Sequence, residues 1–165
     1  MPQPKIAAKT ILEDEWDASN TSISSAPEIH TGNYSQEAEE PQVSITSVSE
    51  TAAEGGETGI SAQSGGGDAV QDSVGDLQID CWSDREANSV NPKKLTREMA
   101  EEARRILLGV GTDVRTKLSG TSLDGTELVQ MTPATPPQER PPEVDRTPVV
   151  YGYLIEANYY YKATE

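Results

Sequence analysis

Cys81 and His30 are the only residues of their types in this 165-residue chain, and they limit the chemistry that it can carry. A Ser-His-Asp or Cys-His arrangement would need His30, which lies in the polar, loop-like stretch "APEIHTGNYS". A single cysteine excludes an intrachain disulfide framework and a cysteine-rich zinc site. We therefore predict no enzymatic activity, no catalytic residue, no cofactor and no metal site.

Hydroxyl groups offer a different chemistry, in which the protein itself is a kinase substrate. Some threonines precede proline, and other Ser and Thr residues have an acidic residue three positions later. A phosphate adds up to −2 of charge and alters binding to basic partners. The phosphorylation candidates are Ser25, Ser47, Thr51, Ser73, Ser83, Thr121, Thr132, Thr135 and Thr147.

The composition predicts a mostly intrinsically disordered chain. Ile, Leu and Val together number 29, Phe is absent, and the net charge is −15. Large apolar residues below roughly 20% of a chain with high net charge are typical of disorder. Ordering each residue costs on the order of 1.5 kcal/mol, which so few buried side chains would not offset.

The charge distribution predicts the class of partner. No Lys or Arg occurs between Lys9 and Arg85, whereas sixteen Asp and Glu do. Phosphates would be repelled, so we expect no direct contact with nucleic acid. The acidic half is either a segment that binds a basic partner surface or a solubilising tether.

The N-terminal sequence "MPQPKIAAKTILEDEWD" lacks the apolar run of a signal peptide. No stretch approaches the ~20 apolar residues of a membrane span. We therefore expect an intracellular, cytoplasmic protein that is monomeric in isolation.

Composition divides the chain into six segments. They are an acidic-aromatic binding segment (1–20), a disordered Ser/Gly-rich acidic tether (21–74), an acidic-hydrophobic segment (75–90), an amphipathic helix (91–111), a disordered Pro/Thr-rich linker (112–148) and a Tyr-rich tail (149–165). For the tail we expect a short β-strand, with a tyrosine-based sorting signal or a phosphotyrosine site as alternatives.

The stretch "NPKKLTREMAEEARRILLGVG" carries every local signal of a helix. Asn91 can cap it with Pro92 in the first position, or Thr96 can be the cap, and Gly109 and Gly111 can end it. Apolar residues recur at spacings of three and four and form one stripe, with Glu102 on the opposite face. A lone helix of this length is marginal in water.

The apolar stripe therefore needs a partner. It either folds against another protein or packs on Ile79, Trp82 and the C-terminal strand in a small local core. The segments at 9–19 and 74–84 also mix apolar anchors with acids, and Leu77 and Ile79 alternate with acids as a strand would. The predicted partner-binding residues are Ile11, Leu12, Trp16, Leu77, Ile79, Trp82, Leu95, Met99, Ile106, Leu107 and Val110.

The order of "ILEDEWD", the acidic tract, "MAEEARRILLGVG" and "TPPQERPPEVDRTP" resembles the disordered N-terminal region of a phosphoprotein of non-segmented negative-strand RNA viruses, paramyxoviruses in particular. The resemblance implies a disordered multi-motif module that binds viral nucleoprotein or host signalling proteins in the host cytoplasm. Its implied roles are nucleoprotein chaperoning, polymerase support or interferon antagonism. A cellular adaptor or an acidic transcriptional-activation protein is the alternative.

Overall fold

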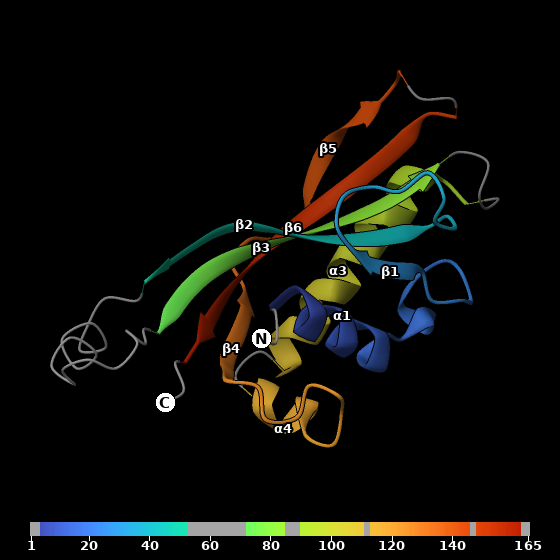
Figure 1. Cartoon of the computed structure of the whole chain (residues 1–165). Coiled ribbons are helices and arrows are strands. Elements are labelled where there is room, and N and C mark those ends of the chain that lie inside the picture. The colour runs from blue at the N-terminus through green and yellow to red at the C-terminus, as the bar shows by residue number, and fades with distance from the viewer. Residues whose placement is uncertain (1–3, 53–71, 85–89, 111–112, 146–147, 163–165) are drawn as a thin grey trace, which may run out of the picture.

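The computed structural model describes residues 4–52, 72–84, 90–110, 113–145 and 148–162. Helices lie against one face of a six-stranded mixed sheet (Figure 1). In chain order the elements are α1 (Pro4–Glu15), η1 (Ala18–Asn20), β1 (Glu28–Thr31), β2 (Gln42–Ala52), β3 (Ser73–Asp84), α3 (Pro92–Val110), α4 (Val114–Leu118), β4 (Leu128–Pro133), β5 (Gln138–Glu143) and β6 (Val150–Tyr161).

The prediction of a mostly disordered chain is wrong. The expected tether, 21–74, contains β1 and β2, and the expected linker, 112–148, contains α4, β4 and β5. The polar, Gly-rich stretch 53–71 lowers the apolar share of the whole chain and lies outside the described residues. Elsewhere the few apolar residues are concentrated on one side of each element. A single sheet with helices on one face needs only one apolar layer, which this number of residues can fill.

The sheet has the strand order β1-β2-β3-β6-β4, and β5 pairs with the other half of β6. β1 runs parallel to β2, whereas every other pair is antiparallel. The central pair is β3 and β6, which stay in register from Ser73 opposite Tyr161 to Asp84 opposite Val150. The strand expected at the C-terminus is thus confirmed, and it lies in the middle of the sheet.

Alternation along the strands separates the two faces of the sheet. Leu77, Ile79 and Cys81 of β3 face the helices together with Ile155 and Ala157 of β6, and all five are fully buried. The acidic-hydrophobic alternation at 75–90 therefore does form a strand, but that strand pairs within this chain.

The helix expected over 91–111 is confirmed as α3, and it packs on β3, β6 and β4. Asn91 is the cap, since its Oδ1 accepts a hydrogen bond from Lys93 N at 3.0 Å, and Pro92 takes the first helical position. Gly109 lies inside the helix and does not end it. The local-core alternative is confirmed in part: the stripe is buried against Ile79 and the C-terminal strand, whereas Trp82 lies on the opposite face of the sheet.

Glu102 does not lie on a solvated face. It is 2% exposed, it accepts a hydrogen bond from Asn20 Nδ2 at 2.6 Å, and it forms an ion pair with Arg105. The segment after α1 covers this side of α3, so that the helix is buried along two sides. A buried carboxylate needs such partners because burial without them carries a large desolvation cost.

Two glycines of the central strand pair lie under aromatic rings. Gly75 is opposite Tyr159, and a Cβ built on Gly75 would lie 2.3 Å from the Tyr159 hydroxyl oxygen and 2.5 Å from the carbonyl oxygen of Ser49. Gly152 is opposite Trp82, and its Cβ would lie 3.0 Å from the indole ring. The first pair is on the helix side and the second on the other side of the sheet, so both faces fix the same register.

Among the described residues, no helix combines the length and the apolar content that crossing a bilayer requires.

Ile106→Asp should lower the free energy of unfolding by about 3–5 kcal/mol, because it places a carboxylate without partners in a site that is 2% exposed. Leu108→Asp is the matched control, since Leu108 is 60% exposed on the same helix, and its cost should not exceed about 1 kcal/mol. Urea unfolding followed by circular dichroism measures both. Equal stability of the two variants would contradict the packing of α3 on the sheet.

Gly75→Ala should destabilise the fold by more than about 2 kcal/mol, because the added methyl group collides with a ring and with backbone at once. Gly109→Ala makes the same chemical change in α3, where nothing lies within 4 Å of the new Cβ. It should stabilise the protein by up to about 1 kcal/mol through helix propensity. Thermal melts of both variants show whether the shifts have opposite signs, and shifts of one sign would contradict the glycine–aromatic pairing.

Candidate functional site

The two residues that could carry nucleophilic chemistry are both used by the fold. Burial raises the pKa of the Cys81 thiol, and Cys81 faces the core under the helices. His30 is not in a loop but in β1, where its Nε2 lies 2.8 Å from Oε1 of Gln42 on the neighbouring strand. In the part of the chain that the structure describes, no three His, Cys, Asp or Glu side chains gather as metal ligands would.

The structure buries nine of the predicted partner-binding residues in the core under the helices, and it buries Trp82 on the other face of the sheet. Ten of them have side chains that the chain's own strands and helices cover, and Trp16 is partly buried against the same core. The covered residues are Ile11, Leu12, Leu77, Ile79, Trp82, Leu95, Met99, Ile106, Leu107 and Val110. In the folded chain these side chains are therefore not available to a partner, and a docking surface has to be found elsewhere.

The phosphorylation candidates lie in unlike environments. Ser25 and Ser47 are exposed, whereas Ser83 is 1% exposed, which keeps a kinase from its hydroxyl in the folded chain. Thr147 lies outside the described residues, and the side chain of Thr51 is also outside them. The remaining candidates are half-buried, namely Ser73, Thr121, Thr132 and Thr135.

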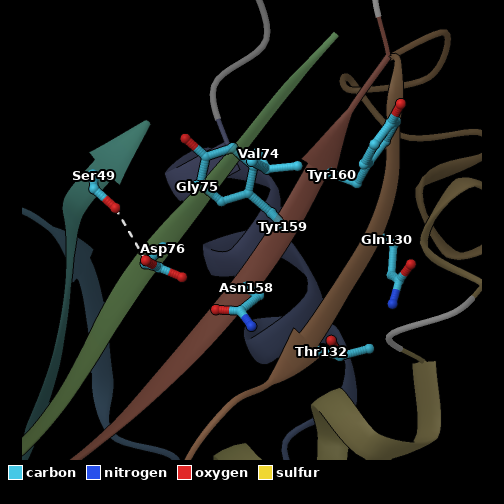
Figure 2. Close-up of a pocket in the computed structure, with 9 residues that line it drawn as sticks. All are labelled: Ser49, Val74, Gly75, Asp76, Gln130, Thr132, Asn158, Tyr159 and Tyr160. Atoms are coloured by element: carbon cyan, nitrogen blue, oxygen red, sulfur yellow. Dashed lines mark hydrogen bonds between the residues drawn. The ribbon is translucent and has the colours of Figure 1, made fainter. Parts of the chain in front are cut away.

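One face of the sheet is left without helices, and part of it is a polar surface. Ser49 pairs with Asp76, Asp76 with Asn158, and Asn158 with Thr132, so that one row of polar side chains crosses β2, β3, β6 and β4. Neighbouring strands are about 4.8 Å apart, which gives the row a length of roughly 14 Å. Figure 2 shows these four residues in sequence across the strands.

This row forms the floor of a groove with a volume of about 410 Å³. Figure 2 shows the Tyr160 ring beyond Asn158 and the Ser49 side chain turned toward Asp76, whose Oδ2 accepts a hydrogen bond from Ser49 Oγ at 3.0 Å. The groove is lined by Ser49, Val74, Gly75, Asp76, Gln130, Thr132, Asn158, Tyr159 and Tyr160.

The groove has an acidic character. Its lining contains the carboxylate of Asp76 and no Lys or Arg. On the helix side of the same strands, burial and the neighbouring Glu50 carboxylate raise the pKa of Tyr159 to about 12, with a smaller contribution from Asp76. Tyr160 in turn donates a hydrogen bond to Asp72. Carboxylates thus surround this end of β3 and β6.

The other end of the same face is closed by side chains of its own. The Trp82 indole Nε1 donates to Ser44 Oγ at 3.0 Å, and the Arg140 guanidinium lies 4.9 Å from the Trp82 ring centroid. Arg140 also binds Asp80 at 2.5 Å, and Tyr34 meets Trp82 edge to face. The charge of Arg140 is therefore already compensated within the fold, whereas the groove end of the face is open.

The groove offers polar groups that can bind a ligand. Asp76 accepts from Ser49, but no histidine lies in the groove to take the serine proton. Hydroxyl, amide and carboxylate oxygens set across four strands present many acceptors. A ligand with several donors and positive charge meets these requirements, because charge-assisted hydrogen bonds to carboxylates are the strong ones.

Sequence reasoning missed Ser49, Asp76 and Asn158 as site residues. The signal was present at Asp76, since the alternation around Leu77 and Ile79 places the intervening polar residues on one face. Pairing across strands could not be read from the sequence, and it is pairing that brings Ser49 and Asn158 to Asp76. Thr132 was predicted as a phosphorylation site and lies at the end of the same row.

The comparisons with known proteins found no relative of this chain. No protein-family model matches the chain, and a search of curated proteins finds no match to it either.

Proposed function

We propose that this domain is a non-enzymatic docking module that binds positively charged segments of partner proteins in the groove over Ser49, Asp76 and Asn158. The single observation that carries the proposal is an acidic groove, without Lys or Arg, on the sheet face that the helices leave open. The net charge of −15 favours encounter with basic partners.

The central strands supply the acidic character. Both β2 and β3 lie in the stretch between Lys9 and Arg85 that has no Lys or Arg. Part of the acidic half is therefore folded, since Asp76, Asp80 and Asp84 stand on β3 and not on a flexible tether. A preordered surface loses less conformational entropy on binding than a disordered segment does.

The narrower roles remain proposals of the same kind. Binding of a nucleoprotein, of a host signalling protein or of transcription machinery would each use a surface that selects a basic segment.

Asp76→Asn should weaken binding of a labelled cationic peptide, acetyl-Arg-Thr-Arg-Thr-Arg-Thr-Arg-amide, by about tenfold, as expected for loss of a charge-assisted hydrogen bond. Fluorescence anisotropy measures the affinity at two salt concentrations. Affinity for the unchanged protein should fall as salt rises, since charges are screened over about 8 Å at physiological ionic strength.

Asp14→Asn is the matched control for this change. Asp14 is exposed on α1, which packs on the opposite face of the sheet, and the substitution removes the same charge. It should leave peptide affinity nearly unchanged. Equal losses for the two variants would show that net charge alone attracts the peptide, and no loss for Asp76→Asn would remove the groove as the binding site.

A further inference from the structure

The two edges of the sheet differ in how they are protected. Along the β4 and β5 edge the sequence places five prolines between 133 and 142, which cannot donate to an added strand. On the other side, β1 covers β2 only from Gln42 to Ile45. The carbonyl of Ile45 accepts from Gly32 N at 2.8 Å, and no described residue pairs with β2 on this side beyond that bond.

The uncovered stretch of β2, Thr46–Glu50, carries one charged residue, Glu50, as its only protecting side chain. It contains no Pro, Lys or Arg, and its side chains are exposed from Ser47 onward, with Val48 at 53%. Figure 1 shows this end of β2 projecting beyond α1 and α3, so that neither helix closes it. A strand with free N–H and C=O groups is a template for another strand.

A bulge joins this free edge to the groove. The register of β2 against β3 shifts between Ser47, which is opposite Leu77, and Ser49, which is opposite Asp76. The shift leaves Val48 exposed and turns Ser49 onto the open face, where it donates to Asp76. Ser49 therefore belongs both to the free edge and to the floor of the groove.

We propose that an extended, basic segment of a partner protein adds as a strand along Thr46–Glu50 and places an Arg or Lys side chain over Ser49 beside Asp76. This inference rests on the proposed function and specifies its partner. An added strand would lie two strand spacings, about 10 Å, from β3. Only a long side chain crosses such a gap, and among long side chains only Arg and Lys complement the carboxylate.

Charge complementarity also selects the occupant. Across Thr46–Glu50 and β3 the ionisable residues are acidic without exception. A second copy of this chain pairing along the same edge would bring two molecules of charge −15 together. A basic strand from another protein removes that repulsion and contributes the opposite charge.

The test uses two methylated forms of the cationic peptide above. One form carries backbone N-methyl groups on its Arg residues and the other on its Thr residues. In an extended strand alternate N–H groups point to opposite sides, so one set would face β2 and the other would face solvent. One form should therefore lose at least about tenfold in affinity while the other binds like the parent peptide. Amide hydrogen exchange along Thr46–Glu50 should slow only with the peptides that bind.

The possible results distinguish failure of this inference from failure of the proposed function on which it rests. If both methylated forms bind like the parent and Asp76→Asn still weakens them, groove binding stands and strand addition is overturned. If no peptide binds, or binding ignores Asp76→Asn, the proposed function fails as well. If the free protein sediments as a dimer whose Thr46–Glu50 amides are already protected, the occupant is a second copy and the basic partner is rejected.

Discussion

Everything in this fold depends on the antiparallel pairing of β3 with β6. The two strands are far apart in sequence, yet they pair over their full lengths; β3 also pairs with β2, and β6 also pairs with β4 and β5. Their register decides which residues face the helices, since a slip of one position would turn Leu77 and Ile155 to the open face. Tyr159 over Gly75 and Trp82 over Gly152 oppose such a slip, because each ring occupies the space that a side chain on its partner would need.

The same pairing explains why one face of the sheet is available for binding. The chain has apolar residues for one core layer, and α1, α3 and α4 use them on one side of the sheet. On the other side the alternate residues of β3 and β6 include polar ones such as Asp76, Gln78 and Asn158. Side chains from outside the central strands close the end around Trp82, through Arg140 and Tyr34. The groove at the end around Asp76 remains open. The acidic composition from which we predicted disorder instead gives this surface its acidic character.

Local features were predictable from the sequence, and long-range ones were not. The cap at Asn91, the stripe of α3 and the β-rich tail follow from spacing and residue type, and the structure confirms the helix and the strand. Disorder was predicted because composition was averaged over the whole chain, including the stretch 53–71. The average apolar content of the chain does not show that the apolar residues alternate along the strands. It also does not show that a helix of the same chain covers Leu77.

The candidate site could not be predicted from the sequence for a related reason. Asp76 is one of many acidic residues in the sequence, and nothing local marks it. It becomes a site residue because the bulge at Val48 brings Ser49 beside it and because β6 supplies Asn158 from the far end of the chain. Conversely, Trp82 and Ile106 were predicted to contact a partner. From the local sequence an apolar residue among charged ones is expected to be exposed, because the sheet that buries it is formed by distant segments. Their burial removes them from the surface.

Native-state amide hydrogen exchange tests the central pairing most directly. If β3 and β6 are the centre of a cooperative fold, the amides of Leu77, Ile79 and Ile155 should exchange only through global unfolding, with protection factors of about 10³ or more. The amides of α3 should also exchange only through global unfolding, because α3 packs on the same sheet. Exchange at unfolded-chain rates in β3 and β6, with protection confined to α3, would contradict the account and leave a lone helix in an open chain.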